Sequence, residues 1–239
     1  MLLCIQFPVK TYLLNMALRL ARMAPQLALV NRLSLAAYHQ NHSMPFTMPS
    51  KTMFVDVETT GLPKKVEGVC TPANPECYDS ARLLEVGYRI HDKEGNEVSN
   101  YTSLIKPKDF KVRATHIHGI TEAHADVYGK DVEEVLEQLH DDLSDVDLVV
   151  GHNVSFDRGV LLSECHRVQD FGKVDMLEHV DWKCTMEMGK EVFGKRLSLV
   201  NLYQQLYGIE VPHVHRSLND VDLCIDAYYA LKKFDSDIH

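Results

Sequence analysis

Two carboxylates lie two residues apart in the segment FVDVETTGL. The alternating pattern predicts a strand over 52–58, so Asp56 and Glu58 leave one face while Val55 and Val57 leave the other. Two carboxylates that share a face repel each other unless a positive group lies beside them. A hard divalent cation such as Mg²⁺, which prefers oxygen ligands and keeps waters for a substrate phosphate, fits that place. A solvated strand face is the simpler explanation of the pair on its own.

A third acid, Asp157, follows the segment VVGHNVSF. We expect a short buried strand to end at Gly151 and a helix to start near Ser155. Asp157 would then lie in the first helical turn at the carboxyl end of a strand, where α/β sheets bind their ligands. The structural alternatives are a favourable acid near a helix N-terminus, or Ser155 as the helix cap. Neither alternative predicts anything about Asp56.

The segment HVHRSLNDVD places His215 five residues before Asp220, in a loop that leads into a long amphipathic helix over 217–234. Ser217 and Asp220 also fit a capping-box variant, so Asp220 has a purely structural alternative. Closely spaced histidines are weak indications of zinc here, because no cysteine or acid accompanies them at ligand spacing. These histidine pairs are His116 with His118 and His213 with His215.

The elements that position these groups alternate along residues 51–239. Period-two patterns predict a three-strand antiparallel meander, with a turn that carries Glu-Gly-Asn between its second and third strands. The meander strands cover 52–58, 81–90 and 98–106, two short strands cover 147–151 and 179–184, and helices cover 131–143, 156–168, 185–193, 197–208 and 217–234. Hairpins followed by strand–helix alternation predict an α/β fold in which helices flank a mixed five-stranded sheet.

Composition restricts the class of protein. The chain has 239 residues, of which 45% are hydrophobic and 25% charged, and these values exclude a disordered or fibrous protein. A net charge of −9 argues against a protein that coats long duplex nucleic acid, because that role requires many cations. Six cysteines without a CxxC pair indicate a reducing compartment rather than a disulfide-stapled secreted module. No stretch reaches about 18 uncharged apolar residues, so we expect no membrane span.

Residues 1–50 differ in kind from the rest. The first 55 residues hold five cations and no acid, with hydrophobic positions at helical spacing opposite a polar stripe. This pattern is typical of a mitochondrial presequence. An upstream start codon explains it equally well, with the native protein beginning at Met44, Met48 or Met53. We therefore divide the chain into an extension, 1–50, and a globular domain, 51–239. We expect a mitochondrial location if the extension is a real presequence, and otherwise the cytoplasm or nucleus.

Taken together, the three chemical segments resemble a known family. Asp-x-Glu on an early strand, Asp after GHNxxF, and His-x4-Asp entering a late helix occur in that order. This order resembles the DEDD superfamily of 3′→5′ exonucleases, in the DnaQ-like subgroup whose third motif contains histidine. The segments 117–121 (IHGIT) and 184–209 match as well, and the resemblance covers roughly 52–233. It implies a ribonuclease H-like fold and hydrolysis of phosphodiester bonds at 3′ ends, releasing nucleoside 5′-monophosphates.

The resemblance also implies a role for each residue. Four carboxylates would hold two Mg²⁺ (or Mn²⁺) ions, with Asp56 bridging both, and His215 would be the general base, because neutral imidazole accepts a proton near neutral pH. The implied metal ligands are Asp56, Glu58, Asp157 and Asp220. Near the terminal nucleotide the resemblance implies Glu58, Thr59, Leu62, Asn153 and His215. Packing beneath an adjacent loop is the alternative for Leu62, and anchoring of the helix is the alternative for Asn153.

The resemblance favours DNA over RNA, because GHNxxFD with HRSLND is most similar to the proofreading and DNA-degrading branch. The expected partner is a single-stranded or frayed 3′ end, together with a polymerase or a replication or repair complex. Two alternatives stay open: a 3′→5′ exoribonuclease, and a non-catalytic nucleic-acid-binding or polymerase-associated module. An insertion over 63–79 contains Cys70 and Cys77, for which free thiols are favoured over a metal clip, and this insertion would shape substrate choice at the rim of the site.

Overall fold

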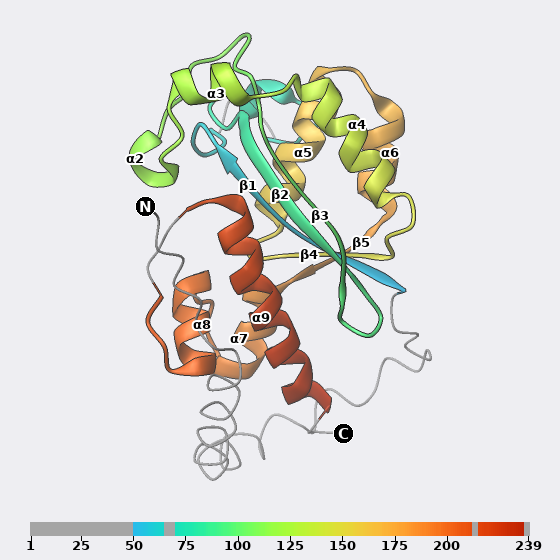
Figure 1. Ribbon diagram of the computed structural model, residues 1–239, viewed down its shortest axis with the longest axis vertical. Coiled ribbons are helices and arrows are strands. Elements are labelled where there is room, and N and C mark those ends of the chain that lie inside the picture. Colours follow the sequence, from blue (N-terminus) through green and yellow to red (C-terminus); the bar gives the residue numbers. More distant parts are fainter. Residues whose placement is uncertain (1–49, 65–69, 212–214, 237–239) are drawn as a thin grey trace, which may run out of the picture. The chain divides into compact units, whose positions relative to one another are not determined.

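A mixed five-stranded sheet forms the centre of the molecule (Figure 1). The computed structural model describes residues 50–64, 70–211 and 215–236. Strands β1, β2 and β3 are antiparallel, whereas β4 and β5 continue the sheet parallel to β1, in the order β3-β2-β1-β4-β5. The strands are β1 (Lys51–Thr59), β2 (Leu83–Asp92), β3 (Glu97–Leu104), β4 (Leu148–Gly151) and β5 (Asp181–Cys184). The predicted meander joined to parallel strands is confirmed.

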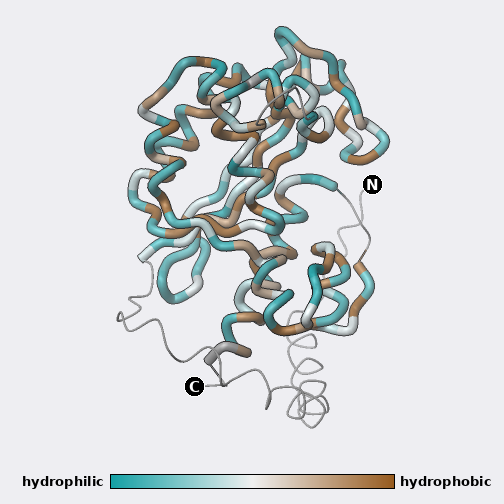
Figure 2. Tube along the Cα trace, turned by 180° about the vertical axis from the view of Figure 1, so that it is seen from behind, coloured by the Kyte–Doolittle hydropathy of each residue, from teal (hydrophilic) through white to brown (hydrophobic). Residues whose placement is uncertain are grey.

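Helices cover both faces of this sheet. Helices α4, α5 and α6 gather on one side, and α7, α8 and α9 on the other (Figure 1). The helices are α2 (Thr115–His118), α3 (Glu122–Tyr128), α4 (Val132–Leu143), α5 (Ser155–Arg167), α6 (Phe171–His179), α7 (Thr185–Phe193), α8 (Leu199–Tyr207) and α9 (Ser217–Ser236), with a 3-10 turn η1 (Pro75–Tyr78). Hydrophobic and hydrophilic residues intermix along these helices (Figure 2), and α4, α7 and α8 each have one apolar and one polar face.

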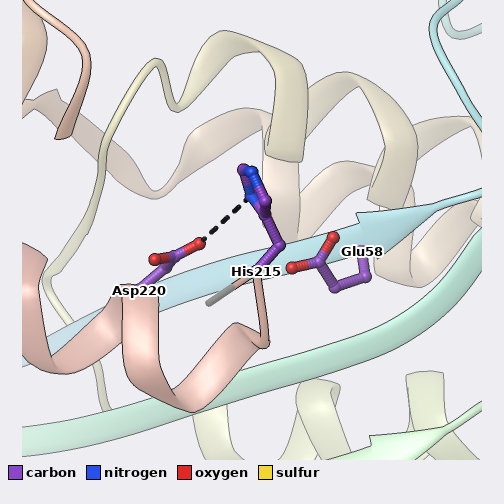
Figure 3. A group of neighbouring side chains, drawn as sticks. All are labelled: Glu58, His215 and Asp220. Carbon is purple, nitrogen blue, oxygen red and sulfur yellow. Dashed lines mark ion pairs between the residues drawn. The ribbon is translucent and has the colours of Figure 1, made fainter. Parts of the chain in front are cut away.

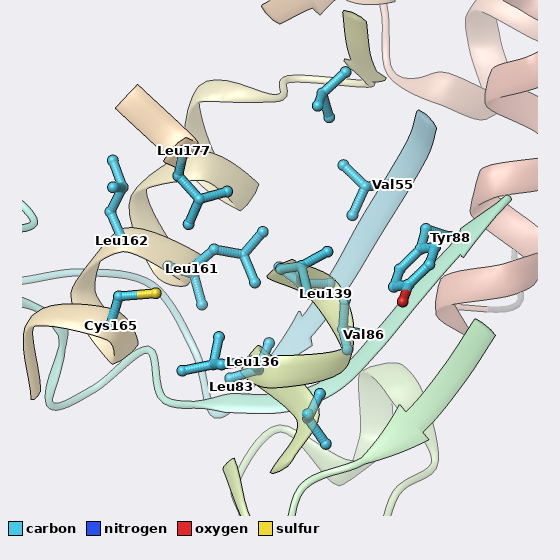
Figure 4. Packing of buried hydrophobic residues seen from close by; sticks show 14 of the residues in the cluster. Val55, Leu83, Val86, Tyr88, Leu136, Leu139, Leu161, Leu162, Cys165 and Leu177 are labelled. Carbon is cyan, nitrogen blue, oxygen red and sulfur yellow. The ribbon is translucent and has the colours of Figure 1, made fainter. Parts of the chain in front are cut away.

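Side chains on the two faces of β1 pack in different hydrophobic clusters. Val55 and Val57 point into the main core, where the leucines of α4 and α5 pack over the sheet (Figure 4). Phe54 leaves the opposite face and packs in a second cluster with residues of α9, among them Tyr228. Since side chains alternate along a strand, Asp56 and Glu58 share the face of Phe54 and look toward α9. Burial of the valine face therefore fixes which way the two acids point.

The sequence pattern does not indicate helix α6. Its first turn contains Gly172, a weak helix former, and its apolar residues show little helical period. Asp170 nevertheless caps it, since the carboxylate accepts a 3.1 Å hydrogen bond from the Lys173 amide. Tertiary packing, in which Val174 and Leu177 enter the main core, stabilises this helix.

Several expectations concern other parts of the chain. The N-terminal extension (1–50) lies outside the described residues except for Ser50. Within the inserted segment, Cys70 and Cys77 are free thiols, as predicted. Of the helices that the structure describes, none is both long enough and apolar enough to cross a bilayer.

Candidate active site

Strand β1 carries the first two acids at its carboxyl end. Glu58 is buried and lies directly opposite Glu85 of β2, while Asp56 lies opposite Gly87. The register of the sheet shifts immediately after Glu58, at Thr59. This bulge ends the regular pairing where the two carboxylates emerge, as is common beside functional sites.

Asp157 reaches the same place from the start of α5. Strand β4 passes into the helix through Gly151, where a Cβ would lie 2.7 Å from Val154 Cγ2 and 3.0 Å from the Val55 carbonyl oxygen. Asp157 is buried, and its Oδ1 accepts a 3.0 Å hydrogen bond from the Val57 amide, between the two acids of β1. The alternative in which Ser155 caps α5 is wrong, because Val154 occupies that position and no side chain caps the helix.

The start of α9 brings the third motif over β1. One ligand atom each from Glu58, His215 and Asp220 lie within 4.8 Å of one another (Figure 3). The His215 Nδ1 is 3.8 Å from the Asp220 Oδ2. The other carboxylate oxygen of Asp220 is buried and has no hydrogen-bond partner within the described part of the chain. Residues from β1, α5 and α9, distant in sequence, thus converge as predicted.

The electrostatics of this cluster are those of carboxylates held too close together. The pKa of Asp56 is raised well above its usual value, first by burial and then by repulsion from Asp157, Asp220 and Glu58. Burial, with repulsion from Asp220 and Glu85, raises the pKa of Glu58 to about 8, although Arg216 opposes the shift. The protein alone therefore does not keep these carboxylates ionised together at neutral pH.

Burial also raises the pKa values of the other two acids, Asp157 and Asp220. Burial raises the pKa of Asp157 to about 8 against the opposing effect of backbone hydrogen bonds, and burial raises the pKa of Asp220 to about 6. A divalent cation would lower all four pKa values by giving the repelling charges a common partner. Oxygen donors, mutual repulsion and the unpaired oxygen of Asp220 make the site a fit for hard cations.

Sequence reasoning missed Glu85 and Arg216. Glu85 is almost fully buried on β2, and its carboxylate accepts hydrogen bonds from the Arg216 guanidinium and from the Ser217 amide and hydroxyl. The capping-box alternative for Ser217 and Asp220 is wrong, because the Asp220 amide donates to the Arg216 carbonyl and the Ser217 hydroxyl donates to Glu85. The available signal was a single acid in the apolar run LLEVGYRI, but its partner lies 131 residues further along the chain.

The predicted substrate-binding residues lie around the cluster in different settings. Thr59 is buried, and its hydroxyl donates a 2.7 Å hydrogen bond to the Gly61 carbonyl, which closes the turn after β1. Leu62 is 73% exposed, so packing beneath the inserted loop does not explain it. Asn153 is exposed and adopts the left-handed conformation, with φ of 60°. Their contacts with a substrate stay predictions.

The other histidines have structural roles or lie elsewhere. His118 is buried, and its ring nitrogens bond to the Arg113 carbonyl and the Ile120 amide. Its partner in the sequence pattern, His116, is exposed, and His213 lies outside the described residues. Of the histidines that the structure describes, His215 alone belongs to the cluster with Glu58 and Asp220.

A comparison with protein families identifies the chain. Its sequence matches the exonuclease family RNase_T over residues 53–228. The chain belongs to this exonuclease family. The matched region contains the four acids and the histidine that the geometry gathers. An exonuclease domain thus occupies nearly all of the part of the chain that the structure describes.

Solved structures share the fold of this exonuclease domain. They include E. coli exonuclease I in complex with a dA16 oligonucleotide, with 20% identity and a TM-score of 0.60, and product-bound exonuclease I, with 19% and 0.59. A moderately thermophilic exonuclease I from Methylocaldum szegediense gives 19% and 0.58. The alignments cover 77% of this chain and 41%, 43% and 40% of those chains, so it spans about two fifths of their length. The predicted ribonuclease H-like fold is confirmed. No match was found among curated proteins.

Proposed function

We propose that the chain is a 3′→5′ exonuclease that uses two divalent cations, Mg²⁺ or Mn²⁺, to release nucleoside 5′-monophosphates from single-stranded or frayed DNA. The observation that carries this proposal is the convergence of four carboxylates, three of them buried, and His215 at the carboxyl end of β1. Membership of the exonuclease family supports it. The presence of every acid argues against a non-catalytic module.

The four carboxylates would bind the cations from different elements of the fold. Asp56 and Glu58 present their oxygens from β1, Asp157 from α5 and Asp220 from α9, so the cations would be held between three separate elements. When bound, the cations activate a water for attack and stabilise the departing 3′ oxygen. Asp157 also bonds the Val57 amide, which keeps its carboxylate aimed between the two acids of β1.

His215 would take the proton of the attacking water. Its ring is about one-third exposed, so it can reach a bound substrate, and its Nδ1 lies 3.8 Å from the Asp220 carboxylate. That carboxylate would orient the ring and stabilise the imidazolium that forms, leaving the other ring nitrogen to accept the proton.

The turn after β1 supports binding of a terminal nucleotide. Gly61 has a φ of 155°, and a Cβ there would lie 2.9 Å from the Ser80 carbonyl oxygen, so glycine lets this turn pack closely against the segment before β2 and leaves the next residue, Leu62, exposed. The exposed Leu62 side chain would pack against the last base. Structures of E. coli exonuclease I hold dA16 and dT13 oligonucleotides, and this supports single-stranded DNA as the first substrate to test.

The test is a time course on DNA and RNA oligomers of matched sequence, labelled at the 5′ end, with Mg²⁺ and with a chelator. We expect products shortened one nucleotide at a time from the 3′ end, from DNA faster than from RNA, and none with the chelator. Asp56→Ala, which leaves the valine face of β1 intact, should abolish cleavage. Faster cleavage of RNA would make the chain an exoribonuclease, and binding without cleavage would make it a binding module.

A further inference from the structure

We propose that Glu85 and Gly87 of β2 form a seat that positions the start of α9, and through it His215 and Asp220, over the acids of β1. This assigns Glu85 as a positioning residue, and it rests on the proposed function. Neither residue belongs to the predicted catalytic set. Arg89 of β2 also bonds Asp222 further along α9, at 2.6 Å, whereas Glu85 bonds the two residues that directly follow His215.

Both carboxylate oxygens of Glu85 are occupied by the segment that follows His215. Glu85 Oε1 accepts from Arg216 Nη2 at 2.5 Å and Nε at 3.2 Å. Glu85 Oε2 accepts from the Ser217 amide and the Ser217 hydroxyl, each at 3.0 Å, and from Arg216 Nε at 3.1 Å. Because the side chain is 3% exposed, water does not replace these partners readily. The carboxylate thus holds two consecutive residues of the third motif.

Gly87 provides the space into which that segment fits. A Cβ at this position would lie 2.4 Å from Ser217 Oγ, 2.9 Å from Ser217 Cβ and 3.1 Å from the Leu218 amide nitrogen. A Cβ does not tolerate contacts of 2.4 and 2.9 Å, so any side chain here would push the start of α9 away from the sheet. Glu85 pulls the segment toward β2, and Gly87 sets how close it comes.

The register of the sheet places this seat directly beside the two acids of β1. Glu85 lies opposite Glu58, and Gly87 lies opposite Asp56, so the seat and the two acids form adjacent rungs on one face of the sheet. His215 directly precedes Arg216, and the Asp220 amide bonds the Arg216 carbonyl at 3.1 Å in the first turn of α9. A shift of the seat would therefore move His215 and Asp220 together relative to β1.

The test compares Glu85→Gln with a matched control, Glu164→Gln. A glutamine offers one accepting oxygen, whereas the contacts of Glu85 use both. Glu164 is equally buried and bonds the Arg82 guanidinium at 2.8 Å and the Leu83 amide at 3.2 Å, but it holds no residue of the cluster. We expect Glu85→Gln to lower kcat by about 10- to 100-fold with KM changed less than about threefold, since small displacements of catalytic groups cost this much. Glu164→Gln should keep kcat within about twofold, because it leaves that geometry in place.

Amide hydrogen exchange supplies a readout that does not depend on activity. In Glu85→Gln the amides of Ser217 and Leu218 should exchange at least about tenfold faster, with α5 unchanged, because local opening is no longer opposed by the carboxylate. Gly87→Ala, which pushes the same segment away from β2 by steric contact, should reproduce the loss of kcat. Unchanged kcat and exchange in Glu85→Gln, or an equal loss of kcat in Glu164→Gln, would overturn the proposal. If the wild type cleaves neither DNA nor RNA, the proposed function fails, and exchange still decides whether Glu85 holds α9.

Discussion

The Val57 amide donates a 3.0 Å hydrogen bond to the Asp157 carboxylate, and this bond joins the start of α5 to the strand segment between Asp56 and Glu58. The Val57 side chain faces the core, whereas its backbone amide orients the Asp157 carboxylate toward the site. The bond holds Asp157 in place whether or not its carboxyl group is ionised.

Asp157→Asn should separate chemistry from folding. The asparagine oxygen can still accept from the Val57 amide, while the charge is lost. We expect cleavage to fall by about 100-fold or more, the range for losing a preorganised electrostatic group. Because the pKa of Asp157 is raised to about 8 by burial, the neutral variant should melt at a higher temperature than the wild type in chelator at pH 8. Equal melting temperatures at pH 8 would contradict this account.

The stability of the metal-free protein should fall as pH rises. Burial and mutual repulsion raise the pKa of Glu58 and Asp157 to about 8, from unfolded values near 4. The folded state therefore binds more protons than the unfolded state between these values, and the free energy of unfolding decreases across this window. Thermal melts in chelator from pH 5 to pH 9 measure this directly.

Magnesium should reverse that trend. The cation binds the ionised carboxylates and must displace their protons, so its affinity rises with pH. We expect a larger increase in melting temperature on adding Mg²⁺ at pH 8.5 than at pH 5.5. A shift that is the same at both pH values would show that Mg²⁺ binds away from the four acids.

His215→Ala should lower kcat without unfolding the domain. The side chain is about one-third exposed and does not fill the core. General-base catalysis contributes about 10²- to 10⁴-fold, so kcat should fall by that factor while KM changes little. Single-turnover assays on labelled oligomers measure the chemical step. A rise in KM with unchanged kcat would assign His215 to substrate binding instead.

Leu62→Ala should weaken substrate binding and leave stability unchanged. Leu62 is 73% exposed, and its burial against a terminal base would contribute about 1.5–3 kcal/mol, so KM should rise roughly tenfold or more. Val127 of α3, 70% exposed, offers a matched control, and Val127→Ala should leave KM as it is. Equal effects of the two substitutions on KM would remove Leu62 from the substrate site.

The sequence predicted those site residues whose positions follow from strand alternation or from a local motif. The alternation around Val55 and Val57 set the face of Asp56 and Glu58, and the passage from β4 into α5 set the place of Asp157. These predictions hold because each depends on the local chain and on burial of one apolar face.

Glu85 escaped prediction for the opposite reason. The role of Glu85 depends on its contact with Arg216, which lies far away in the sequence. No pattern near either residue indicates this contact. Helix α6 was missed because Gly172 and an irregular apolar pattern give little local signal, and packing stabilises the helix instead. Long-range contacts of this kind become visible only when the strands and helices are assembled.

The site draws on residues that span nearly the whole domain, from Asp56 near its beginning to Asp220 on its last helix. During synthesis the first two acids leave the ribosome long before the histidine and the last acid that complete them. A nascent or truncated chain that stops before α9 would therefore carry no competent nuclease.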